Sequence, residues 1–205
     1  MTEPELKDVI ATGFSQAGYF IRGRGVSMYL SVGYSIGWFS GLINKIETQD
    51  VIVNLDHIII NAWLRLDPLQ SDSAMIEEIE ALMENFPNNP QYDTATSVLD
   101  SLVDKGVAIF ASSNIALYNL IKDYRIIRNG VPNCTPESLG SGEVQHIMYV
   151  DDPVPLSFEQ LDIWRTANWK KTVGEVYAEL SSVMDLTKFM DNLLYLKREF
   201  MVFLA

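Results

Sequence analysis

Residues 25–44 form a stretch of twenty residues without a single charged side chain. Large apolar or aromatic residues fill every even position of this stretch from 26 to 38, whereas glycine or serine fills five of the six odd positions between them. Alternation with period two is typical of a strand that buries one face, so we expect a strand near 26–39. From this face we predict four residues at an interface: Val26, Met28, Leu30 and Trp38.

The same stretch allows two other structures. Gly33, Gly37 and Gly41 are spaced four residues apart, as in helices whose backbones pack closely together. Four glycines and four serines, however, are poor helix formers in water. Residues 25–44 also have the length of about 20 residues that a membrane span requires, so membrane association through this segment is an alternative.

Composition limits the classes of partner. Aspartate and glutamate total 27 against 15 lysines and arginines, giving a net charge of -12. This balance argues against a nucleic-acid surface, because binding phosphates requires basic residues. Apolar side chains make up 48% of the chain and charged ones only 20%, against about 25% in ordinary soluble domains. A high share of apolar side chains together with a low share of charged ones favours either a well-filled core or an interface with protein partners.

Charge is also segregated along the chain. No basic residue lies between Arg65 and Lys105, whereas that stretch contains nine acidic residues. Basic residues gather later, around 122–128 and 165–171. Patches of opposite sign on two copies would orient their association, although solvated helix faces give the same pattern.

Helical spacing of apolar residues and capping residues predict most of the chain. The expected helices cover about 2–18, 50–66 (capped by Asp50), 73–84 (capped by Ser73), 94–106, 113–130, 157–180 and 185–204. Within 157–180, Ser157 with Gln160 and Thr172 with Glu175 are expected to form capping boxes. Residues 107–110 are either a short strand or a buried link, and a second strand is expected at 144–150. The predicted fold is therefore α+β, predominantly α-helical, with a small antiparallel sheet.

A length of 205 residues suits a single domain, which we assign to 1–205. Residues 130–142 contain three glycines, two prolines and two serines and lack a helical period. This loop is therefore a potential boundary within the domain.

Two further regions contain candidate interface residues. Trp164, Arg165 and Trp169 belong to an aromatic and basic segment of the kind found at interface hot spots. Phe200 and Phe203 belong to an apolar C-terminal segment, which we expect to be docked in the chain's own core or in a neighbouring subunit.

Motifs for chemistry are absent. The sequence contains no GxSxG, GxxxxGK[ST], GxGxxG or HExxH pattern, and its single cysteine, Cys134, excludes a multi-cysteine metal site. We therefore assign no catalytic, cofactor-binding or metal-binding residue and expect a protein that is not an enzyme. No charged and then apolar leader begins the chain, so we expect no signal peptide and an intracellular location, either soluble or within a large particle.

These observations favour a structural or assembly subunit, or an adaptor, that binds protein partners as a homo- or hetero-oligomer, with a virus-like or secretion-type particle as one setting. Membrane association through 25–44 is the first alternative. The second is an enzyme or small-ligand protein whose site is assembled from scattered residues. A pocket that contains two or more titratable groups with shifted pKa values would favour the second alternative.

Overall fold

The computed structural model describes residues 28–35, 45–49, 51–87, 91–132, 143–145 and 154–205. Helices predominate in this part of the chain, and the strands form small antiparallel sheets, which confirms the predicted fold class. The described helices are α2 (His57–Arg65), α3 (Asp72–Glu84), α4 (Ala95–Asp104), α5 (Asn114–Ile121), α6 (Phe158–Thr166), α7 (Val173–Leu180) and α8 (Leu186–Arg198). The expected helix at 2–18, Val26 and Trp38 lie outside the described residues.

Every described helix begins in the same way. The residue before it is Ser, Thr or Asp, and its side chain accepts the backbone N–H of the residue three positions later. Such caps satisfy N–H groups that the helix itself leaves unpaired. The predicted capping boxes of Ser157 with Gln160 and of Thr172 with Glu175 are both confirmed. The expected caps Asp50 and Ser73 are wrong, because Asp56 caps α2 and Ser71 caps α3.

Among the described residues, four small sheets replace the one that was expected. Two strands form each of the sheets β1–β5 and β10–β6, and three strands form each of the sheets β2–β3–β4 and β7–β8–β9. All the pairs are antiparallel. The strands are β1 (Met28–Ser31), β2 (Tyr34–Ser35), β3 (Lys45–Thr48), β4 (Val51–Asn54), β5 (Ala108–Ala111), β6 (Ile126–Arg128), β7 (Val131–Pro132), β8 (Glu143–Gln145), β9 (Val154–Pro155) and β10 (Val202–Leu204).

The predicted strand at 26–39 is interrupted within its described part. β1 and β2 belong to different sheets, and the chain bends between them at Gly33, whose φ is 91°. An uninterrupted strand cannot contain this conformation, which L-residues with a side chain rarely adopt. Of the strand expected at 144–150, only the beginning is described, as part of β8.

Three predicted helices are too long. Residues 51–54, which include two valines and an isoleucine, form strand β4, and the helix begins only after Asp56. The helix from Ser113 ends at Ile121, and the last helix ends at Arg198, because 126–128 and 202–204 pair as β6 and β10. Helical spacing of apolar residues continues across these boundaries, so the periodicity alone did not locate them.

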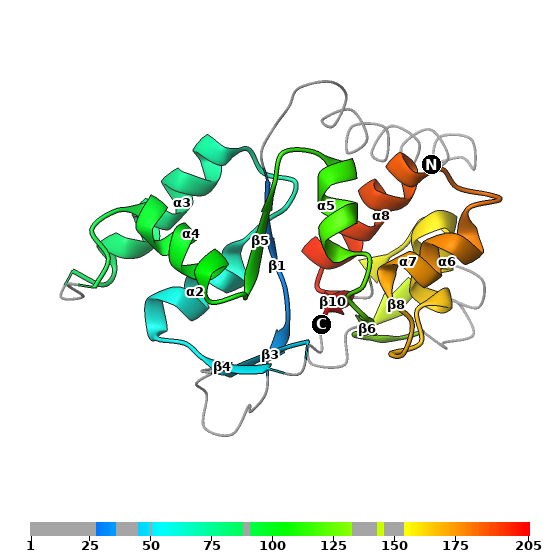
Figure 1. The fold of residues 1–205 in the computed structure, drawn as a ribbon, viewed down its shortest axis with the longest axis horizontal. Helices are drawn as coiled ribbons and strands as arrows, with labels where there is room; N and C mark the ends of the chain where they lie inside the picture. The colour runs from blue at the N-terminus through cyan, green and yellow to red at the C-terminus, as the bar shows by residue number, and fades with distance from the viewer. Residues whose placement is uncertain (1–27, 36–44, 50, 88–90, 133–142, 146–153) are drawn as a thin grey trace, which may run out of the picture.

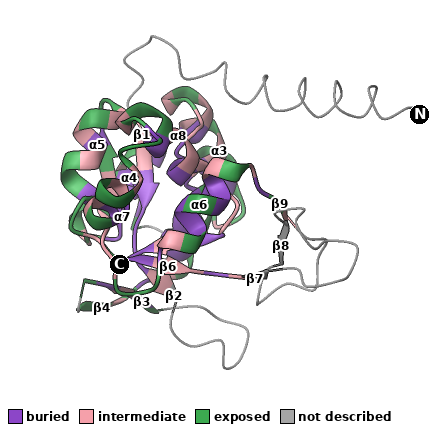
Figure 2. Cartoon of the chain, turned by 90° about the vertical axis from the view of Figure 1, so that its right-hand side faces the viewer, coloured by how far each residue is buried: buried purple, intermediate pink, exposed green. Residues whose placement is uncertain are grey.

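The described residues form two hydrophobic cores. One contains residues of α2, α3 and α4, and the other contains residues of α5, α6, α7 and α8 with β6 and β10. Strands β1 and β5 lie between these two groups of helices (Figure 1). Buried residues line the inner sides of the helices, and exposed residues their outer sides (Figure 2). The cores therefore meet at β1 and β5, whereas most of the predicted boundary at 130–142 lies outside the described residues.

The β1–β5 pair contributes to both cores because alternate side chains of a strand point to opposite faces. On β1, Leu30 belongs to the core of α5–α8, whereas Tyr29 packs against the core of α2–α4. On β5, Ala111 belongs to the first of these cores and Ala108 to the second. This short ribbon therefore holds the two groups of helices together.

Several segments converge where β1 ends. The backbone N–H of Val32 donates to the carbonyl of Val107, and the carbonyl of Val32 accepts the indole N–H of Trp63 at 3.0 Å. The N–H of Gly33 donates to the carbonyl of Leu204 in β10. These bonds join α2, the start of β5 and the C-terminal strand at one point of the backbone.

The C-terminal segment is docked in the chain's own core. Val202 and Leu204 are fully buried, and Ala205 exchanges backbone hydrogen bonds with Arg125. Of the two locations expected for this segment, the structure places it within its own chain. An apolar strand of this kind stabilises the fold by removing its side chains from water.

Substitution of Gly33 by alanine tests the constraint at this bend. A Cβ atom at Gly33 would overlap with Cγ2 of Ile46 and would lie 2.8 Å from the carbonyl oxygen of Glu47. Gly106 is a matched control, because its φ is also positive, at 69°, but no atom lies within 4 Å of an added Cβ. In urea denaturation we expect Gly106→Ala to cost about 1–2 kcal/mol for the backbone conformation. Gly33→Ala should cost about 1–3 kcal/mol more because it also overpacks the site. Equal costs would contradict the crowding at Gly33.

Candidate functional site

A pocket of about 810 Å³ lies at the junction of the two groups of helices. One side is formed by six residues of the segment 64–70, which contains the end of α2 and most of its connection to α3, and by Glu78 of α3. The opposite side is formed by α8, with Phe200 after it and with Ser157 and Gln160 at the beginning of α6. The residues of α8 that line the pocket are Lys188, Asp191, Asn192, Tyr195, Lys197 and Arg198.

The exposed basic residues of this lining form ion pairs with carboxylates. Arg198 Nε lies 3.4 Å from Asp67 Oδ2, which connects α8 to the segment 64–70. Arg65 Nε lies 3.7 Å from Glu78 Oε1, and Lys188 Nζ lies 2.7 Å from Glu159 Oε1. Exposed pairs of this kind contribute little to stability, so we regard them mainly as groups that set the charge around the pocket.

Three titratable groups of the lining have shifted pKa values. Burial raises the pKa of Asp191, and the hydrogen bond from the Asn114 amide, which lowers this pKa, only partly opposes the rise. Burial also raises the pKa of the Tyr195 phenol, with a smaller contribution from the charge of Glu199. Burial lowers the pKa of the Lys197 amine to about 8. A pocket with two or more such groups is the observation named above in favour of the second alternative, and buried structural groups show the same shifts.

Lys197 is the most unusual of these residues, because its side chain is buried and no carboxylate in the described part of the chain forms an ion pair with it. Its Nζ donates to Ser31 Oγ at 2.8 Å and lies 5.6–5.7 Å from the ring centroids of Trp63, Phe200 and Phe203. Aromatic rings attract a cation, but burying a charge without a counter-ion costs several kcal/mol. This amine thus lies between the two cores, in contact with β1, α2 and β10.

The residues predicted at an interface are distributed over several environments. Leu30 and Trp164 are buried in the chain's own core, where they offer no surface to a partner. Met28 and Phe203 are partly buried against the two cores, and Phe200 lines the pocket. Two of the predicted residues lie on the surface: Arg165 and Trp169. The predicted residues that the structure describes are not gathered into one patch.

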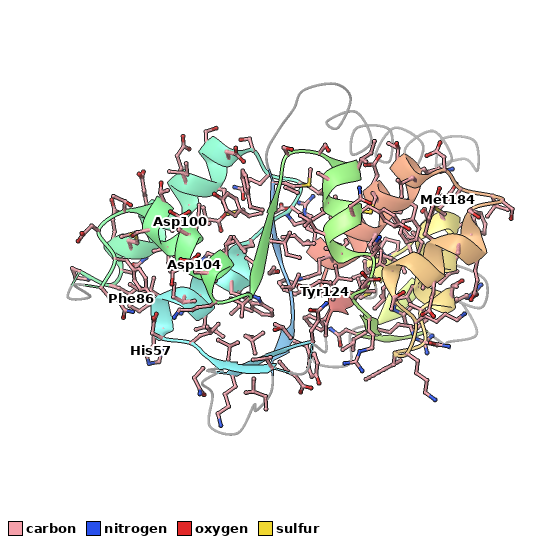
Figure 3. All side chains as sticks on the ribbon, viewed as in Figure 1. His57, Phe86, Asp100, Asp104, Tyr124 and Met184 are labelled. Atoms are coloured by element: carbon pink, nitrogen blue, oxygen red, sulfur yellow. The ribbon has the colours of Figure 1, made fainter. Side chains whose placement is uncertain are left out.

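Charged and titratable residues noted in the sequence lie mainly on the surface. Asp100 and Asp104 are on the exposed side of α4, as in a solvated helix face, and His57 projects from the beginning of α2 (Figure 3). Among the described residues, no group of three or more His, Cys, Asp or Glu side chains could hold a metal ion. No helix in the described ranges has the length and hydropathy to cross a membrane.

Sequence reasoning missed Asp191 and Lys197. A signal for Lys197 was present, because it lies four residues after Leu193 and seven after Met190, on the apolar stripe of α8. Near the end of a helix, a lysine on the apolar stripe can still extend its amine into water, or the amine can be buried at a desolvation cost. Only the tertiary structure shows which of the two occurs. Asp191 had no comparable signal, because its environment depends on Asn114, which is 77 residues away in the sequence.

Comparisons with known proteins do not assign the chain to a family. No protein-family model, no curated protein and no solved structure matches it.

Substitution of Lys197 by methionine tests the cost of the buried amine. Below pH 8 the folded and unfolded chains both carry the charge, so the folded state bears the full desolvation cost. As the pH rises from about 8 towards 10.5, the folded state releases its proton first, which stabilises it by up to about 3 kcal/mol. We therefore expect Lys197→Met to be more stable than the wild type at pH 7 and this difference to shrink at pH 9.5.

Urea denaturation at both pH values measures this difference, and Arg198→Met serves as the control. Arg198 is the next residue of α8 but is exposed, so its substitution should change stability by about 1 kcal/mol or less, without this dependence on pH. A Lys197→Met variant that is less stable than the wild type at both pH values would contradict the expectation. Contacts of the amine with Ser31 and the three rings would then outweigh its desolvation.

Proposed function

We propose that this protein binds a small ligand in the pocket between residues 64–70 and α8. The observation that carries the proposal is the coincidence, in one pocket, of Asp191, Tyr195 and Lys197, whose pKa values burial shifts. Titratable groups with perturbed pKa values concentrate at functional sites, and pockets between groups of packed elements are common ligand sites. This proposal takes up the second alternative from the sequence, an enzyme or small-ligand protein with a site assembled from scattered residues, but includes only the binding of a ligand and no catalysis.

The composition of the lining supports this proposal. Three leucines and the rings of Tyr195 and Phe200 provide apolar surface, and amide side chains such as Gln70 and Asn192 provide hydrogen-bonding groups. Ligand pockets typically combine apolar walls with a few polar groups that orient the ligand. A volume of about 810 Å³ lies within the usual range for such pockets, about 300–1,000 Å³.

A fragment screen monitored by ¹H–¹⁵N NMR tests the proposal. We expect at least one compound to shift the amide signals of residues 64–70 and of α8, and the variant Asn192→Trp to weaken its binding by filling the pocket. Thr187→Trp is the matched control, because Thr187 is exposed on the same helix and does not line the pocket. The proposal fails if no compound shifts these signals, or if Asn192→Trp binds as well as the wild type does.

A second candidate function, assembly through protein docking, is favoured by strand β4. This strand lies at the edge of its sheet, and its Val51 and Ile52 are 58% and 57% exposed. Unpaired backbone groups on an exposed apolar edge can bind another strand. A second copy of this chain, paired antiparallel through β4, would form a symmetric dimer.

The molar mass in solution tests this docking. We expect the wild type to have a mass above the 23.1 kDa of one chain, and Ile52→Lys to shift it towards that value, because a lysine on an edge strand disfavours pairing. Ile115→Lys is the control, because Ile115 is similarly exposed, at 63%, but lies on α5. A wild type that remains at 23.1 kDa over the concentration range of light scattering contradicts docking between copies.

A further inference from the structure

Asp191 differs from the other two carboxylates of the pocket. Asp67 is paired with Arg198 and Glu78 with Arg65. Asp191 Oδ1 accepts a hydrogen bond of 2.8 Å from the neutral amide of Asn114, and no cation of the described residues lies within ion-pair distance of Asp191. The pocket thus contains a partly buried carboxylate that forms no ion pair with the basic side chains of the described ranges.

Gln70 supplies a second acceptor in the same pocket. Its Oε1 atom is buried and has no hydrogen-bond partner among the described residues. Buried polar atoms nearly always have a partner, so an unpaired one requires an explanation, such as a group that the bound state supplies. Both Gln70 Oε1 and the ionised Asp191 carboxylate accept hydrogen bonds, so a ligand that pairs with both carries hydrogen-bond donors.

The basic residues of the lining do not favour an anion instead. Arg65, Lys188 and Arg198 are already paired with carboxylates, and an anionic ligand would have to compete with those pairs. Lys197 Nζ is directed to Ser31 and to aromatic rings between the cores. A net charge of -12 also raises the local concentration of cations around the protein.

Tyr195 completes this side of the pocket. It follows Asp191 by four residues on α8, so the two side chains are neighbours on the same helix face. An aromatic ring beside a carboxylate suits an organic cation, because the ring face attracts positive charge and also packs against apolar atoms.

We propose that this pocket binds a small organic cation with N–H donors, such as an amidine or a primary amine, which pairs with Asp191 and donates to Gln70 Oε1. This proposal rests on the proposed function, since it names the class of ligand for the same pocket. The apolar part of the ligand would lie against Tyr195 and the leucines of the segment 64–70.

Three compounds of nearly identical shape but different charge test the class of ligand: benzamidine, benzamide and benzoate. Their affinities for the intact protein are measured from the NMR signals of residues 64–70 and of α8. We expect benzamidine to bind best. Asp191→Asn should weaken benzamidine roughly tenfold or more, because the charge-assisted hydrogen bond is lost, and should leave benzamide nearly unchanged. Asp162→Asn, which changes an exposed carboxylate of α6 outside the pocket, should have no effect.

The outcomes separate this proposal from the function on which it rests. Binding of benzamide or benzoate in the pocket as tight as that of benzamidine would overturn the cation class but keep the ligand pocket. Benzamidine affinity that Asp191→Asn leaves unchanged would overturn the role of Asp191. If none of the three compounds binds but the fragment screen finds other ligands in the pocket, the cation class fails and the ligand pocket stands. If the fragment screen is also negative, both proposals fail.

Discussion

The backbone at Val32 and Gly33 is the constraint on which the rest of the structure depends. Hydrogen bonds from this point reach the start of β5, the indole of α2 and the C-terminal strand β10. Gly33 also packs so closely against β3 that no side chain fits there. Segments that are far apart in the sequence are therefore fixed relative to one another by a few atoms, and the two cores acquire a defined junction.

The proposed ligand pocket depends on this junction. Residues 64–70 follow α2, whose Trp63 donates to Val32, while α8 carries Lys197, whose amine donates to Ser31 in β1. Both walls of the pocket are thus anchored to the end of the same strand. Burial of the amine carries a desolvation cost, and the same group connects β1, α2, α8 and β10 at a single point.

Local signals in the sequence predicted much of the fold. Capping residues such as Ser157 and Thr172 marked the beginnings of helices, because a cap depends only on residues a few positions away. The ends of helices were predicted poorly, since β6 and β10 form by pairing with each other across more than 70 residues. The pocket was not predicted at all, because burial of Asp191 and Lys197 results from tertiary packing. Val26 and Trp38 lie outside the described residues, so the interface prediction for them stays a prediction.

The shared β1–β5 ribbon also has a consequence for the dynamics of the protein. Four residue pairs join these two strands, and their side chains belong to both cores. Each group of helices covers one face of the ribbon, so neither group can open fully without exposing the ribbon side chains that it covers. Amide hydrogens in the two halves should therefore exchange with solvent as one cooperative unit under native conditions, while those at the outer ends of the helices exchange independently through fraying.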